Sequence, residues 1–155
     1  MPGSRAAKAG AACYFLWGLI HVVGGLAQLA ALRQGGGGAL AAMISSASPV
    51  DPATPIVAPA AAFMGMGAAN IVVFGVLVAA LARLNWNNDT RGYWLNLLIV
   101  GAVDVNLALF LLLPGHMAWS DGLVGIGLFV PAALLTTLAR RQPSPMAFEA
   151  RGVTS

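Results

Sequence analysis

The sequence is poor in charge and in cysteine. Only 8% of its 155 residues are charged and 59% are hydrophobic, whereas a soluble domain carries about 25% charged residues. So few charges cannot cover a globule in water, which excludes an ordinary soluble domain. The single cysteine, Cys13, excludes an internal disulfide, and we interpret it as a small apolar residue.

The positive charge is too small and too scattered for a nucleic-acid partner. The formal net charge is +3, and the longest basic run is the pair Arg140 and Arg141. A nucleic-acid interface needs a basic patch or stripe. The four glycines at 35–38 are not a phosphate-binding loop, because neither a strand before them nor a Lys-Ser/Thr pair after them is present.

What the sequence does have is long apolar runs. A bilayer core of about 30 Å is crossed by about 20 mainly apolar residues in a helix, and lipid-exposed backbone must satisfy its own hydrogen bonds. Four stretches meet this requirement, at 11–32, 57–82, 94–113 and 122–139. They predict an all-α, integral membrane four-helix up-and-down bundle that forms a single domain over 1–155. The first stretch is too long for a signal peptide, and we expect it to be retained.

The basic residues predict the orientation in the bilayer. Basic loops resist translocation and stay in the cytoplasm. All but Arg33 of the eight Lys and Arg residues fall on one side of the predicted spans: Arg5, Lys8, Arg83, Arg91, Arg140, Arg141 and Arg151. Both termini are therefore expected in the cytoplasm, the C-terminus as a short tail at 141–155.

A long external loop is predicted at 33–56. It begins with the four glycines, continues through a weakly helical Ala39–Ile44 and ends in a proline-rich stretch. Such a segment is flexible at its glycines and stiff at its prolines. It can act as a lid over the outer mouth of the bundle or as a plain tether, and the tether is favoured because long loops often only connect.

Three polar residues fall near the middle of three different spans. At a rise of 1.5 Å per residue, His21, Asn70 and Asp104 each lie about halfway through the bilayer. Polar side chains in hydrocarbon are costly, so each suggests a functional site. An imidazole, an amide and a carboxyl group at one depth satisfy one another only if they face a shared interior, and we expect them to do so.

Helical spacing adds the residues expected to line this interior. In the first span Tyr14, His21 and Gln28 are seven apart, and Trp17 lies four before His21, so they form one stripe. In the second span Met66 lies one turn before the midplane amide. A helix face of apolar, aromatic and flexible side chains with a single polar group is typical of a pocket for an apolar molecule.

These residues predict acid/base chemistry on a small lipophilic molecule. We assign His21 as acid or base, Asp104 as its partner or as the proton donor, and Asn70 as the group that orients the substrate. A carboxyl group that burial keeps protonated can donate a proton, and a carboxylate can orient the imidazole. The reactions that fit are those of an isomerase, a hydrolase or a cyclase.

Two other functions remain open from the sequence. If the polar residues only hold helices together, the chain is an accessory or structural subunit of a larger membrane complex, with partner membrane subunits on its apolar faces. If the chain forms a homo-oligomer, it can be a proton or solute channel. Asn106 lies two residues after Asp104 and therefore points away from it, toward another helix or another subunit.

No cofactor and no metal are expected. His116 and Asp121, at the outer end of the third span, are too few to hold a metal ion, and Asp121 is expected to cap the fourth helix. A haem between two histidines is disfavoured, because His21 and His116 differ in depth by about 15 Å. The expected partners are thus the lipid bilayer and a small lipophilic molecule.

Overall fold

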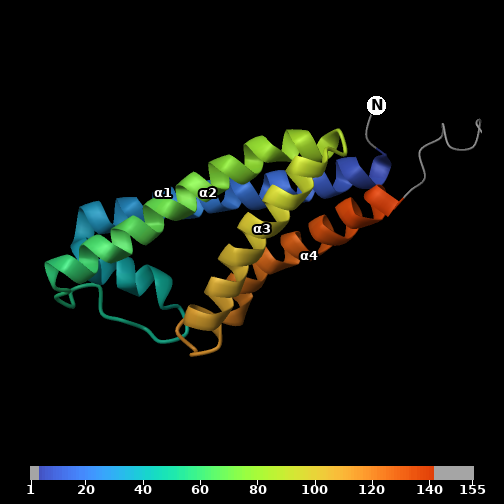
Figure 1. The fold of residues 1–155 in the computed structure, drawn as a ribbon. Helices are drawn as coiled ribbons and strands as arrows, with labels where there is room; N and C mark the ends of the chain where they lie inside the picture. The colour runs from blue at the N-terminus through green and yellow to red at the C-terminus, as the bar shows by residue number, and fades with distance from the viewer. Residues whose placement is uncertain (1–3, 142–155) are drawn as a thin grey trace, which may run out of the picture.

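The computed structural model describes residues 4–141 as an all-α up-and-down bundle (Figure 1). The remainder of the predicted cytoplasmic tail, 142–155, lies outside the described residues, as does Arg151. The helices of the described part are α1 (Arg5–Ile44), α2 (Ala58–Trp86), α3 (Thr90–Leu107), which continues into a π-helical turn η1 (Ala108–Leu112), and α4 (Trp119–Arg141). No strand occurs between residues 4 and 141. The predicted fold class is confirmed.

The four long helices are apolar enough to cross a membrane, and their surface suits lipid. Large hydrophobic side chains are exposed on them, including Phe63 at 71% and Phe110 at 68%. The largest buried side chains include Trp17 and Tyr14. An apolar surface around a small core is the arrangement expected in a bilayer, where lipid rather than water covers the outside.

The helices pack closely because small residues lie between them. A Cβ added to Gly25 of α1 would lie 2.9 Å from the backbone oxygen of Ala68 in α2, and one added to Gly10 would lie 3.0 Å from the oxygen of Ala132 in α4. Such distances leave no room for a larger residue. Close backbone approach at glycine and alanine is the usual device by which membrane helices associate.

The first helix extends beyond its predicted end at residue 32. It continues to Ile44 with a kink at Gly36, where φ is 70° and ψ is −163°, a conformation that glycine adopts without strain. Beyond the kink Leu40 is fully buried. The glycines that suggested a flexible loop are therefore held by packing, and the first part of the predicted 33–56 loop is helical.

The residues that follow α1 cross to the other half of the molecule. Figure 1 shows α1 and α2 running side by side, with α3 and α4 meeting them at the end near the N-terminus and moving away toward the other end. There three hydrogen bonds join residues 46–48 to residues 115–118: Ala47 N to His116 O, 3.1 Å, Ser48 Oγ to Gly115 O, 2.9 Å, and Ala118 N to Ser46 Oγ, 3.0 Å. We call these contacts the clasp.

Candidate functional site: a pocket beside His21

Trp17 connects α1 to α3 through a buried hydrogen bond. Its side chain is fully buried, and its Nε1 donates to Oδ1 of Asp104 over 3.2 Å. A buried indole N–H needs such an acceptor. Asp104 is itself only 5% exposed, so this bond lies inside the bundle and fixes the orientation of the indole ring.

His21 lies on the indole of Trp17, one helical turn further along α1. The two ring centroids are 3.6 Å apart with an interplanar angle of 19°, and the Nδ1 of His21 donates to the backbone oxygen of Trp17 over 2.8 Å. A carbonyl oxygen can only accept, so the proton of this bond belongs to Nδ1. In the neutral ring Nε2 then carries a lone pair that is free to accept a proton or a hydrogen bond.

Gly125 of α4 lies where these three side chains meet. A Cβ added there would be 3.3 Å from Cε1 of His21, 3.4 Å from Nε1 of Trp17 and 3.5 Å from Oδ1 of Asp104. The three groups, from α1 and α3, therefore converge on one backbone position of α4. A larger residue at this position would push against the imidazole ring.

A pocket of about 360 Å³ begins at His21. It lies within the size range of small-molecule sites. Each helix of the bundle contributes to its aliphatic lining, which includes Ile20, Ile44, Ile71, Leu107, Leu111 and Val124. The polar groups of the pocket are His21, Gln28 and Asp121. Ile44 and Met117, which also line it, adjoin the clasp in the sequence. The pocket thus runs from the middle of α1 toward the clasp.

The predicted site residues lie in different surroundings. His21 and Gln28 line the pocket. Tyr14 and Trp17, predicted to line it, are instead fully buried in the core, with Trp17 beneath the imidazole. Asp104 is close to His21, but the hydrogen bond it makes is to Trp17. Trp17 therefore mediates between two groups that were expected to pair directly.

The structure does not bring Asn70 or Met66 to the pocket. Both are exposed, Met66 at 52%, and neither lines the cavity beside His21. The inward face of α2 is formed by small residues, among them Gly65, Ala68 and Gly75. The site was expected where the first, second and third spans meet. The structure instead forms it where α1, α3 and α4 meet.

Sequence reasoning missed two buried amides. Asn85 and Asn96 are 2% and 0% exposed, and within the described residues their side-chain atoms have no hydrogen-bond partner, like the Tyr14 hydroxyl and Oδ2 of Asp104. The signal was present in α3, because Asn96 lies eight residues before Asp104, a spacing that places both side chains on the same broad face of a helix. The observed inward face of α3 includes Gly92, Asn96 and Asp104.

The remaining polar residues lie outside the pocket or at its mouth. Asn106 is exposed and donates to its own helix at Ala102 O, 2.9 Å. Asp121 was expected to cap the fourth helix, but α4 begins at Trp119, so Asp121 lies within the first turn. A negative charge at this position interacts favourably with the helix dipole. Between residues 4 and 141 no three His, Cys, Asp or Glu side chains are placed to hold a metal ion.

Fold and site together define a class of protein, an α-helical membrane bundle with a mainly apolar pocket between its helices. Comparison of the chain with known protein families, curated proteins and solved structures finds no match.

Proposed function

We propose that this protein binds a small lipophilic molecule in the pocket and that His21 exchanges a proton with it. The pocket has an aliphatic lining with few polar groups, which suits an apolar body with one polar or acidic point. It lies in a bundle whose outer surface is apolar, so a molecule dissolved in the bilayer can reach it without entering water.

The observation that carries this proposal is the hydrogen bonding of His21. Its Nδ1 is occupied by the Trp17 carbonyl oxygen, so the neutral ring presents Nε2 as a base. When Nε2 takes up a proton, the resulting imidazolium is stabilised by the carbonyl oxygen and by the face of the indole ring on which it lies. The same ring can therefore accept a proton and later return it.

Isomerisation is the reaction that this arrangement supports with the fewest components. The Nε2 of His21 removes a proton from a carbon that lies between a carbonyl group and a double bond, so that the electron pair is held as a conjugated enolate, and the imidazolium returns that proton at the far end of the shifted bond. Substrate and product then have the same atoms and charge. Asp104 is a positioning residue in this scheme, since it holds the Trp17 indole on which the imidazole lies.

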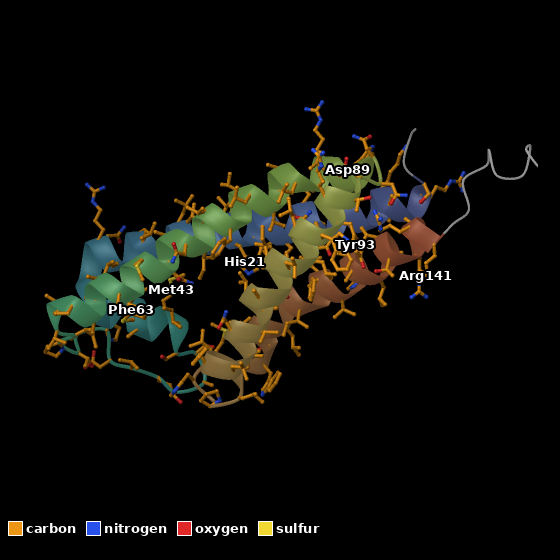
Figure 2. All side chains as sticks on the ribbon, in the orientation of Figure 1. His21, Met43, Phe63, Asp89, Tyr93 and Arg141 are labelled. Carbon is orange, nitrogen blue, oxygen red and sulfur yellow. The ribbon has the colours of Figure 1, made fainter. Side chains whose placement is uncertain are left out.

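We further propose that both termini lie in the cytoplasm and that the chain crosses the bilayer as a multi-pass protein. Six basic residues of the described part support this, because they lie near the N-terminus, the α2–α3 turn or the end of α4: Arg5, Lys8, Arg83, Arg91, Arg140 and Arg141. Figure 2 places Asp89 of that turn and Arg141 at the same end of the bundle. The pocket then lies in the half of the bundle that faces away from the cytoplasm.

The experiment fills the pocket without disturbing the packing. Gly24 lines the pocket, and a Cβ added there meets no atom within 4 Å, so Gly24→Phe places a ring where the ligand would lie. Gly67→Phe is the matched control, because Gly67 is an exposed glycine of α2 whose Cβ would also meet no atom within 4 Å. Helix propensity and added bulk are thus the same in both variants.

The measurement is mass spectrometry of the organic extract of each purified protein. We expect a lipophilic compound at close to one molecule per chain from the wild type and from Gly67→Phe, and its loss from Gly24→Phe. An extract that contains only bulk phospholipid, or a compound retained equally by both variants, would rule out the pocket as a binding site.

A further inference from the structure

A second hollow lies on the outside of the bundle, between α1 and α2 near the basic end. It is a groove of about 500 Å³ lined by alanines of both helices, among them Ala12 and Ala79, and by Phe15, Trp86 and Arg83. Its α2 residues span 79–86, about 10 Å along the helix at the usual rise. This length covers about two thirds of the hydrocarbon layer of one leaflet.

The end of this groove is positively charged. Arg83 lines it, and the Nζ of Lys8 lies 5.6 Å from the centre of the Trp86 ring. The one acidic residue at this end of the described chain is Asp89, whose Oδ1 accepts from the backbone nitrogens of Arg91 and Gly92. Its carboxylate is thus engaged in capping α3, and the two cations near the groove attract an anion.

We propose that this groove binds one anionic phospholipid. One acyl chain lies against the alanines and Phe15, and the phosphate lies at Arg83 and Lys8, level with Trp86. A tryptophan of this kind prefers the headgroup layer, and basic residues beside an apolar groove at the cytoplasmic face bind anionic headgroups. The inference does not depend on the pocket beside His21, because it uses no residue of that pocket.

Charge and position favour an anionic lipid over the alternatives. A zwitterionic lipid carries an ammonium group near its phosphate and gains less from two cations. A helix of another chain would bring apolar surface to the alanines but no negative charge to Arg83 and Lys8. An anionic phospholipid supplies both the chain and the charge that the groove accommodates.

The test compares two lipids and three arginine variants of the full chain. Native mass spectrometry is performed in detergent with added dioleoyl-phosphatidylglycerol or dioleoyl-phosphatidylcholine. We expect one phosphatidylglycerol to remain bound more strongly than phosphatidylcholine, and Arg83→Gln to weaken that binding about fivefold, the loss typical of one basic residue near a headgroup. Arg91→Gln, at the same end but outside the groove, and Arg33→Gln, at the other end, should leave it within twofold.

A second variant tests the acyl-chain part of the groove. Ala12 is exposed and lines the groove, so Ala12→Leu narrows the groove without touching the core. We expect this variant to lose phosphatidylglycerol binding although every charge is kept. Equal losses in Arg83→Gln and Arg91→Gln, or unchanged binding in Ala12→Leu, would overturn the proposal, because either result indicates diffuse attraction to a basic surface.

Discussion

The hydrogen bond between Trp17 and Asp104 organises the site, and each partner depends on the other. Asp104 is buried, and its Oδ2 has no partner among the described residues. The Nε1 of Trp17 is therefore the only side-chain donor that the described residues supply to this carboxyl group. Removing the indole N–H leaves a buried carboxyl group without a hydrogen-bond partner among the described residues. This lowers stability more than replacing both members of the pair by apolar residues.

We predict that Trp17→Phe lowers the free energy of unfolding by about 1–3 kcal/mol through the unpaired carboxyl group alone, with a further loss from the smaller ring. The double variant Trp17→Phe with Asp104→Leu should recover part of this loss, because no polar group is then left without a partner. Unfolding curves in detergent measure both. A double variant less stable than Trp17→Phe would contradict the assigned hydrogen bond.

At the scale of helices, glycines decide how closely α1 and α2 approach. A Cβ on Gly18 would lie 2.5 Å from the backbone oxygen of Gly75 and 2.9 Å from the backbone nitrogen of Ala79. Backbone atoms of a helix cannot move aside as a flexible side chain can. The packing penalty at this position therefore exceeds the gain of about 1 kcal/mol that alanine brings to a helix interior.

We predict that Gly18→Ala lowers the melting temperature in detergent, whereas Gly67→Ala leaves it unchanged or raises it slightly. Gly67 is exposed, and a Cβ there would meet no atom within 4 Å. Both substitutions gain the same intrinsic helix preference of alanine, so the difference between their melting temperatures reports the packing at Gly18. A stabilised Gly18→Ala variant would show that the two helices do not approach as described.

The clasp closes the end of the molecule where α3 and α4 move away from α1 and α2. Two of its hydrogen bonds use the hydroxyl groups of Ser46 and Ser48, and these bonds are exposed. We predict that Ser46→Ala combined with Ser48→Ala speeds hydrogen exchange at residues 45–57 at least several-fold while the melting temperature changes little, because exposed hydrogen bonds contribute weakly. Unchanged exchange would mean that other contacts hold the connector.

The helices were predictable because long apolar runs determine them, whereas their rotation was not. Depth alone placed His21, Asn70 and Asp104 together, but depth does not say which side of a helix faces inward. In α2 the inward side follows the small residues Gly65, Ala68 and Gly75, which leaves Asn70 outside. The stripe of Trp17, His21 and Gln28 was more informative because spacing along one helix carries the rotation as well as the depth.

Two features of the structure could not be derived from local sequence. The glycines at 35–38 favour a loop by intrinsic preference, and only the packing of Leu40 and its neighbours makes the segment helical beyond the kink. The position of Trp17 between His21 and Asp104 depends on how α3 crosses α1, which spacing within either helix does not specify. Tertiary packing decided both.

At the scale of the whole molecule, the basic end lies at the cytoplasmic face in the proposed orientation, and the pocket lies in the half of the bundle that faces away from the cytoplasm. Cys13 is the single cysteine and is partly buried, so Cys13→Ala gives a cysteine-free background. In that background we predict that Ser48→Cys is labelled by a membrane-impermeant maleimide added to intact cells, whereas Ser155→Cys is labelled only after the cells are lysed. The reverse pattern would invert the proposed topology.

The central claim is that a lipophilic molecule lies in the pocket with one of its groups at the Nε2 of His21. An experimental density map of the full chain in lipid nanodiscs, made from protein that has never been exchanged into excess detergent, tests this most directly. We predict elongated density in the pocket between His21 and the clasp, ending within hydrogen-bonding distance of Nε2. A pocket filled by the protein's own side chains would contradict the proposed ligand, and so would an imidazole whose Nε2 is hydrogen-bonded to another residue of the bundle.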